Sequence, residues 1–169
     1  MSDLVVKRAE GPACIDSLTE LYRHLHGAQT RAAPHLAHMP QRSAEESWRR
    51  RRAAYEQWLA VPGAFVLLAQ RDAETVGFAL VTFAGAYHGW SSGPRVAELK
   101  DLAVAPAARG KGIGSRLLDE VEHELGRVGV EEYRLNVIAP NEDAIRLYTR
   151  RGMTHVTTVF LAKVTRPDP

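Results

Sequence analysis

The chain has 169 residues and a single cysteine, Cys14, so it cannot form an internal disulfide. The helical pattern around Cys14 predicts a small core residue at this position. No run approaches the roughly 18 consecutive apolar residues of a membrane span, and no secretory signal opens the sequence. Together these absences predict a bacterial-type cytoplasmic protein with no membrane partner.

A strong excess of one charge is also lacking, because 22 Lys and Arg residues face 20 Asp and Glu residues, for a net charge of +2. This balance argues against nucleic acid as a partner, since a nucleic-acid binder using Arg49–Arg52 would need a basic surface. Four consecutive helical residues spread over most of the helix circumference. Arg49–Arg52 therefore predict a solvated helix, with a role near phosphates or an acidic partner as the alternative.

A metal centre is not expected either. His24, His26, His35 and His38 lie close together in the sequence, but their spacings match no usual helical ligand pair. No cysteine or clear acidic partner completes a site with them.

The composition predicts one domain over residues 1–169, since 45% of residues are hydrophobic and 25% are charged, without an internal repeat or linker. The first half predicts a strand over 3–9, a helix over 12–26, an irregular connection over 27–42, a helix from a Ser43 cap to about Ala60, and a hairpin of strands 65–70 and 76–83. The second half predicts a loop over 85–94, a strand over 96–104, a helix buried through Leu117, Leu118, Val121, Leu125 and Val128, a strand over 133–139, a helix from Asn141 to Gly152, and a strand over about 154–164. This order predicts an α/β sandwich around one mixed sheet.

The segment Leu99–Leu118, LKDLAVAPAARGKGIGSRLL, is the most informative part of the sequence. An apolar strand leads into an Arg-Gly-Lys-Gly-Ile-Gly loop and then into a helix. Glycines let the backbone approach a ligand closely, and the helix directs free N–H groups and its positive dipole end at the loop. Such a site holds an anion, most often a phosphate or pyrophosphate, and Arg109 and Lys111 add positive charge.

Two familiar nucleotide loops do not fit this segment. A P-loop needs a glycine where Ala105 stands and a Ser or Thr where Gly112 stands. A dinucleotide-binding fingerprint starting at Gly110 and Gly112 needs a third glycine at the position of Ser115.

The Arg-Gly-x-Gly-x-Gly loop after a Leu-Ala-Val strand resembles motif A of the GNAT superfamily, the acetyl-CoA-dependent N-acetyltransferases. The stretch LNVIAPNEDAIRLYTRRGM, residues 135–153, resembles the second half of the same family. The specific match covers roughly residues 97–153. It implies a GNAT-like single-domain fold with a mixed, mostly antiparallel sheet flanked by helices. In this fold the central strands, here those before the glycine loop and near residue 135, splay apart and coenzyme A inserts between them.

The resemblance implies that acetyl-CoA is the cosubstrate and assigns its contacts. The amide of Leu102 would stabilise the thioester oxyanion, and the pantetheine arm would bind the main chain of Ala103 and Val104. The pyrophosphate would bind backbone groups of Arg109, Gly110, Lys111, Gly112, Ile113, Gly114 and Ser115. Asn141 would touch the cofactor arm, or would serve only as a helix cap.

Acetyl transfer to an amine needs a group that accepts a proton from the amine and one that protonates the leaving thiolate. Glu98 is the candidate base, because several family members have Glu there; the alternative is a surface carboxylate paired with Lys100 or Arg95. Asp101 is near, and a regular strand would turn it to the other side unless a bulge inverts the direction. Tyr148 matches the family's tyrosine and is the candidate acid; the alternative is a core aromatic.

The sequence leaves the acceptor open. Aromatic residues that could line its pocket are Tyr87, His88, Trp90, Trp48, Tyr55 and Trp58. The leading hypothesis is direct acetyl transfer to a primary amine of a small molecule, peptide or protein. A non-catalytic acyl-CoA-binding or sensor module is the alternative, and the resemblance also makes a homodimer a candidate state.

Overall fold

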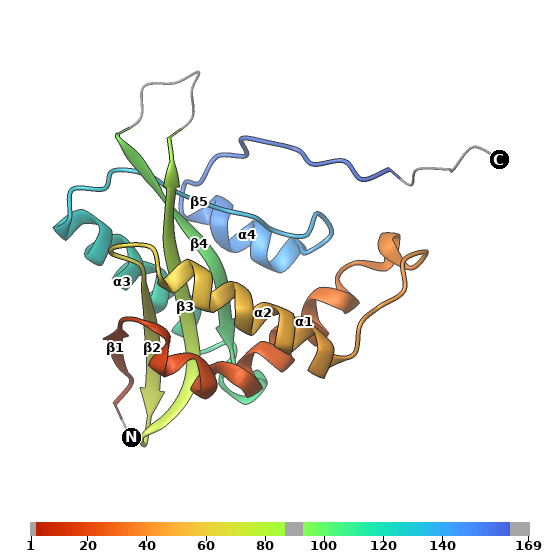
Figure 1. The fold of residues 1–169 in the computed structure, drawn as a ribbon, viewed down its shortest axis with the longest axis horizontal. Helices are drawn as coiled ribbons and strands as arrows, with labels where there is room; N and C mark the ends of the chain where they lie inside the picture. The colour runs from red at the N-terminus through yellow and green to blue at the C-terminus, as the bar shows by residue number, and fades with distance from the viewer. Residues whose placement is uncertain (1–2, 87–92, 163–169) are drawn as a thin grey trace.

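The computed structural model describes residues 3–86 and 93–162, and its centre is a five-stranded sheet in the order β1-β2-β3-β4-β5 (Figure 1). The strands are β1 (Val5–Ala9), β2 (Phe65–Arg71), β3 (Glu74–Gly85), β4 (Arg95–Val104) and β5 (Tyr133–Leu135). The helices are α1 (Thr19–Arg31), α2 (Ala44–Leu59), α3 (Ile113–Arg127) and α4 (Glu142–Arg150), with short 3₁₀ helices over Pro12–Leu18, Pro34–Leu36 and Pro106–Ala108. The expected mixed, mostly antiparallel sheet is confirmed, because only the β4–β5 pair is parallel.

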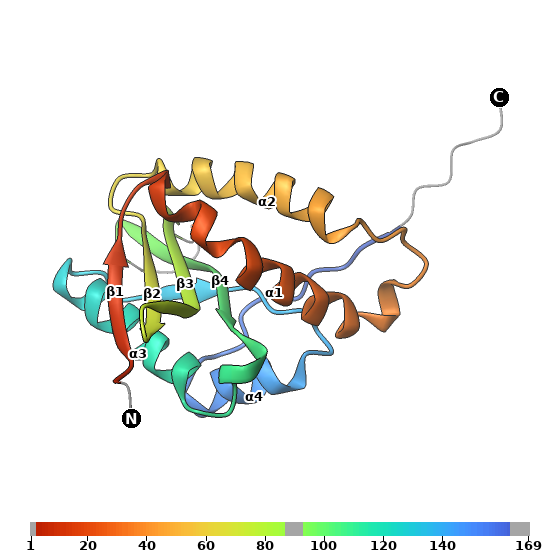
Figure 2. The ribbon, with the colours of Figure 1, turned by 90° about the horizontal axis from the view of Figure 1, so that it is seen from below.

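Helices cover both faces of the sheet, with α1 and α2 on one side and α3 and α4 on the other (Figure 2). Alternating strand residues supply two apolar layers. Phe78 and Leu80 of β3 pack toward α1 and α2, whereas Ala79 and Val81 pack toward α3. The buried face of α3 includes Leu117, Leu118, Val121 and Leu125, as its periodicity predicted.

A β-bulge interrupts β4 opposite the middle of β3. Leu80 pairs with Asp101 and Val81 pairs with Leu99, so Lys100 is the extra residue and has no partner on β3. As a result Leu99 and Leu102 both pack in the α3 layer, although residues three apart in a regular strand face opposite sides. The bulge therefore turns Asp101 to the α1–α2 side of the sheet.

The two strands β4 and β5 separate soon after they meet. Their described pairing covers Ala97–Leu99 of β4 and Tyr133–Leu135 of β5, while β4 continues to Val104. The second half of β4 therefore has no strand on its β5 side within the described residues. This geometry is the splay that the resemblance implied.

Several expected boundaries were wrong. The first helical region begins as a 3₁₀ helix over Pro12–Leu18, and α1 continues to Arg31 into the segment expected to be irregular. The strand expected over 133–139 ends at Leu135, and residues 154–162 of the last expected strand form no regular element. Val128 lies beyond the buried face of α3 and is exposed, and Cys14 is only half-buried at the edge of the core.

Ser43 and Asn141 cap their helices as expected, since their side chains accept hydrogen bonds from the amides of Glu46 and Ala144. Gly152 has a φ of +79°, which suits the left-handed position just beyond α4. Among residues 3–86 and 93–162 no helix is long and apolar enough to cross a membrane.

Gly77 allows β3 to lie close to both β4 and α3. A Cβ added at Gly77 would lie 2.9 Å from the carbonyl oxygen of Ala103 and 3.4 Å from side-chain atoms of Ile113 and Leu117. The backbone contact cannot relax without a shift of β4. We therefore expect Gly77→Ala to lower the free energy of unfolding by about 1–3 kcal/mol in a urea titration.

Gly85→Ala is the matched control, since Gly85 lies in the same strand and an added Cβ there meets no atom within 4 Å. Equal stability of the two variants would contradict the close packing at Gly77.

Candidate active site

A small pocket of about 30 Å³ lies where β4 and β5 separate. Its lining comes from Glu98, Leu99 and Lys100 of β4 and from Arg134, Leu135 and Asn136 at β5. This volume exceeds the roughly 10–15 Å³ that a cavity needs in order to hold one water molecule. The pocket brings the expected base, Glu98, to the beginning of the split.

Glu98 is held by two cations. Its carboxylate forms ion pairs with Lys100 on the same strand and with Arg134 on β5, and the Arg134 Nε donates to Oε1 over 2.6 Å. Burial alone would raise the pKa of Glu98, but the hydrogen bonds from Lys100 and Arg134 outweigh it and lower the pKa below its usual value. Glu98 is therefore kept ionised.

Asp101 has a different environment on the same side of the sheet. Its carboxylate is buried, accepts a 2.6 Å hydrogen bond from the Tyr55 hydroxyl of α2, and lies 3.7 Å from Nη1 of Arg51. Burial raises the pKa of Asp101, although the charge of Arg51 and the bond from Tyr55 oppose the shift. The two carboxylates thus have pKa values displaced in opposite directions.

Tyr148, on α4, is influenced electrostatically by Asp101. It is partly buried and packs against the α3 layer of the core. Burial raises the pKa of Tyr148 to about 12, and the negative charge of Asp101 contributes to the shift. The phenol is therefore protonated at neutral pH and can act as a proton donor.

A polar cluster fixes α4 against α3 and β5. Arg151, just after α4, contacts Asp119 at 2.8 Å and Glu122 at 2.9 Å on α3, and the Tyr133 hydroxyl of β5 donates to Glu122. Together with the Asn141 cap at the other end of α4, these contacts hold the helix that carries Tyr148.

The glycine loop between β4 and α3 adopts a conformation suited to an anion. Gly110 and Gly112 have φ values of +73° and +75°, which L side chains rarely adopt. Gly112 is the N-cap of α3 and supplies no side-chain cap, so no side chain of the N-cap occupies the amides of the first helical turn, which point toward the loop. In this structure Arg109 and Lys111 are exposed, and each donates to a carbonyl group nearby, of Val104 and Ala107.

The main chain of β4 leading to this loop has an open edge. The Ala105 amide donates to Val76 on β3, whereas the Val104 carbonyl accepts from Arg109 on the other side. Because strand residues alternate in direction, Leu102 shares the side of Val104, and Ala103 shares the side of Ala105. The alternation favours Leu102 and Val104 over Ala103 as contacts for an extended ligand along this edge.

Arg51 is the site residue that sequence reasoning missed. Its guanidinium lies 5.6 Å from the ring centroid of Tyr22 and 5.4 Å from that of Trp58, in addition to its contact with Asp101. Arg51 shares a helical stripe with Trp48, Tyr55 and Trp58, whose spacings of three and four residues put them on one face of α2. A cation within an otherwise aromatic stripe was the signal that could have identified it.

The aromatic residues that were expected to line the acceptor pocket lie in different environments. Trp48 and Tyr55 are buried in the core, whereas Trp58 is partly exposed beside Arg51 and Lys100. Tyr87, His88 and Trp90 lie outside the described residues.

Glu120, His123 and Glu124 form the one group in the described part of the chain whose ligand atoms are near enough for a metal ion. The carboxylate of Glu124 is already paired with Arg8 and Arg127. The group lies on α3, and none of its residues lines the β4–β5 pocket.

Comparisons with known proteins identify acetyltransferases as similar proteins. Residues 20–153 match the acetyltransferase (GNAT) family. An aminoalkylphosphonate N-acetyltransferase of Salmonella typhimurium is 33% identical over 93 residues, which cover 54% of this chain and 57% of that protein. A mycothiol acetyltransferase of a Nocardioides species is 31% identical over 129 residues, which cover 71% of this chain and 42% of that protein. The chain thus spans about half the length of these curated relatives.

Solved structures share the fold. An aminoglycoside N-acetyltransferase in complex with CoA has a TM-score of 0.70 at 16% identity, covering 97% of this chain and 96% of that chain. A ribosomal-protein-alanine N-acetyltransferase from Brucella melitensis has a TM-score of 0.64 at 18% identity, covering 96% of this chain and 100% of that chain.

Proposed function

The chain belongs to the acetyltransferase (GNAT) family, and from this premise we propose that it transfers acetyl from acetyl-CoA directly to a primary amine. The observation that carries the proposal is the open edge of β4, which joins an uncapped glycine loop to a pocket lined by Glu98. The charge of Asp101, on the same strand, reaches Tyr148. In this reaction a C–N bond forms, the C–S bond of the thioester breaks, one proton leaves the amine, and the thiolate receives one.

The residues present fit coenzyme A. The amides from Arg109 to Ser115, at the positive end of the α3 dipole, would hold the pyrophosphate, and Arg109 and Lys111 would exchange their carbonyl contacts for phosphate contacts. The open main chain of Leu102 and Val104 would hold the pantetheine arm, with Asn141 beside it, whereas the main chain of Ala103 faces β3. The Leu102 amide would donate to the thioester carbonyl oxygen.

We assign the base to Glu98, acting through a water in the 30 Å³ pocket, and the acid to Tyr148. The alternative base is Asp101, whose raised pKa makes it the stronger proton acceptor but whose carboxylate is buried against Tyr55. In our assignment Asp101 instead supports Tyr148, because its negative charge favours the neutral phenol.

The names of relatives fit an amine acceptor, since they include acetyltransferases for aminoalkylphosphonates and for the Nε of thialysine, the latter 33% identical in Mus musculus. We place the activity in the cytoplasm and expect neither a resident metal ion nor nucleic acid to take part. A non-catalytic acyl-CoA sensor is the second candidate, which the presence of Glu98 and Tyr148 disfavours.

We expect Tyr148→Phe to lower kcat by about 10²-fold or more, because the thiolate loses its proton donor. Thiol release from acetyl-CoA measures kcat, and calorimetric titration with CoA measures binding, which should change less than twofold. Tyr133→Phe is the comparison variant, because it also loses a phenol, but one that donates to Glu122 and helps to hold α4, so its loss of kcat should be smaller. Unchanged turnover in Tyr148→Phe would refute the assignment, and CoA binding without turnover of any amine by the wild type would support the sensor.

The pH dependence of kcat/KM distinguishes the two carboxylates. A base must be deprotonated, so activity falls as the pH drops through its pKa. With Glu98 as base this acidic limb lies below the usual carboxylate range, and Glu98→Gln loses activity at all pH values. A limb above the usual range that disappears in Asp101→Asn would instead identify Asp101 as the base.

We also propose a homodimer built on residues 154–162. Val156, Val159, Phe160 and Leu161 are 60–91% exposed in this extended segment, which follows α4 in Figure 1. In the sheet order β5 has an open outer edge within the described residues, to which the segment of a second copy can add as a strand.

Light scattering should give the dimer mass for the wild type and the monomer mass for a Val159→Thr, Phe160→Ser double variant. Val128→Thr is the control, because Val128 is also an exposed apolar residue but lies at the end of α3. A monomeric wild type would refute the dimer.

A further inference from the structure

Arg51 is surrounded mainly by aromatic rings rather than by carboxylates. The rings of Tyr22 and Trp58 lie near the guanidinium, whose charge is stabilised by Asp101 and the Tyr22 hydroxyl. The carboxylate oxygen of Asp101 is 3.7 Å from Nη1 of Arg51, which exceeds hydrogen-bond length. Among the described residues, no carboxylate oxygen is within hydrogen-bond distance of this guanidinium.

Asp101 does not need Arg51 as a hydrogen-bond donor, because Oδ2 already accepts from Tyr55 at 2.6 Å. A guanidinium has five N–H donors in a planar fork that matches an acidic group. The aromatic rings hold this fork in place, so binding an anion requires little loss of side-chain entropy. Arg51 therefore has the chemistry of a preorganised anion receptor.

Lys100 adds a second positive charge over the same indole. Its Nζ lies 5.0 Å from the ring centroid of Trp58 and pairs with Glu98. Arg134 approaches Glu98 from β5, so three cations surround two carboxylates. An acceptor with several amino groups would meet like charge here, whereas an acidic group would meet opposite charge.

We propose that the acceptor is a primary amine bearing an acidic group, a carboxylate or phosphonate, that Arg51 and Lys100 bind beside Trp58. Its amino group then lies toward Glu98, the proposed base, to which it gives up a proton. This inference rests on the proposed acetyl transfer and specifies its substrate class.

Matched pairs of amines test the substrate class. Each pair is an amino acid and the amine that remains without its carboxylate, such as phenylalanine with phenethylamine, tyrosine with tyramine, and lysine with cadaverine. A further pair, β-alanine and 2-aminoethylphosphonate, distinguishes carboxylate from phosphonate. We expect thiol release with at least tenfold higher kcat/KM for the acidic member of the accepted pair.

Equal or faster reaction of the amines without an acidic group would overturn the inference and leave the proposed function intact. Absence of both CoA binding and thiol release would overturn the proposed function itself, and the acceptor class with it.

Variants of Arg51 test its role directly. Arg51→Gln should raise KM for the accepted acidic amine about tenfold or more, with KM for its partner without the acidic group unchanged. Arg51→Lys should recover part of the loss by restoring the charge, and Lys100→Gln should act in the same direction as Arg51→Gln. CoA affinity and the melting temperature verify that each variant is folded.

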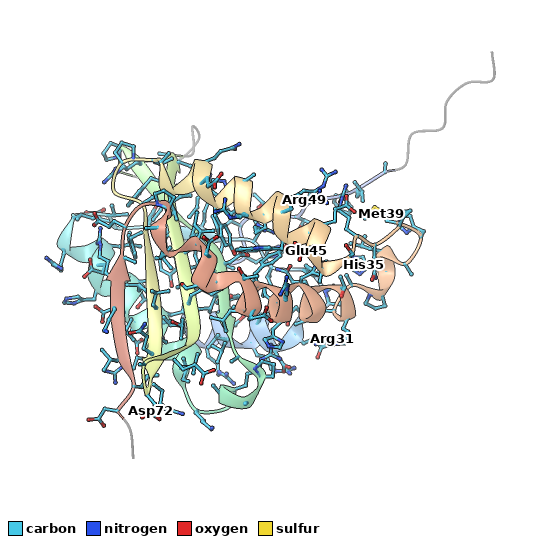
Figure 3. All side chains as sticks on the ribbon, turned by 60° about the horizontal axis from the view of Figure 1, so that its bottom comes forward. Arg31, His35, Met39, Glu45, Arg49 and Asp72 are labelled. Carbon is cyan, nitrogen blue, oxygen red and sulfur yellow. The ribbon has the colours of Figure 1, made fainter. Side chains whose placement is uncertain are left out.

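Arg49→Gln is the matched control, because Arg49 is an exposed arginine on the same helix (Figure 3). If Arg51→Gln raises KM equally for both members of a pair, or for neither, Arg51 acts in packing and the inference fails.

Discussion

The bulge at Lys100 is the constraint on which the site depends. If β4 ran without the bulge, with Lys100 paired in register, Asp101 would face the apolar α3 layer beside Leu99, where a carboxylate without partners costs several kcal/mol. With the extra residue, Asp101 faces α2 and meets Tyr55 and Arg51. The pairing of β4 with β5 ends at Leu99, just before the bulge. The bulge therefore lies next to both the charged side chains of Glu98 and Asp101 and the open main chain that follows in β4.

The two carboxylates of β4 illustrate how neighbouring acids acquire different properties from their surroundings. Glu98 borders a pocket and has two cationic partners, which favour its ionised form. Asp101 is nearly inaccessible to solvent. It accepts a hydrogen bond from the Tyr55 phenol, but the cation of Arg51 lies beyond hydrogen-bond distance, so burial dominates and raises the pKa of Asp101. Displaced pKa values in neighbouring groups are typical of sites that move protons. Here the charge of Asp101 also helps to raise the pKa of Tyr148.

Features that depend on short stretches of sequence could be predicted. The hairpin of β2 and β3, the caps at Ser43 and Asn141, and the left-handed Gly152 each follow from local turn and helix chemistry. The sequence left the direction of Asp101 open, because a bulge is set by pairing with β3 rather than by residues within β4. The strand expected over 154–164 is rich in β-branched residues, but a strand needs a partner, and none of the described strands pairs with residues 154–162.

The run Arg49–Arg52 shows why position on a helix matters more than charge count. Successive residues on α2 point about 100° apart, so Arg50 and Arg52 reach Glu46, Asp16 and Glu56 at the surface, where ion pairs contribute about 0–1 kcal/mol. Arg51 is directed inward, where water screens its charge less and each interaction is stronger. A half-buried arginine whose neighbours are two aromatic rings, one tyrosine hydroxyl and one carboxylate beyond hydrogen-bond distance is costly for stability alone. An acidic ligand that completes its hydrogen bonds offsets this cost, which gives a functional reason for the cation in an aromatic stripe.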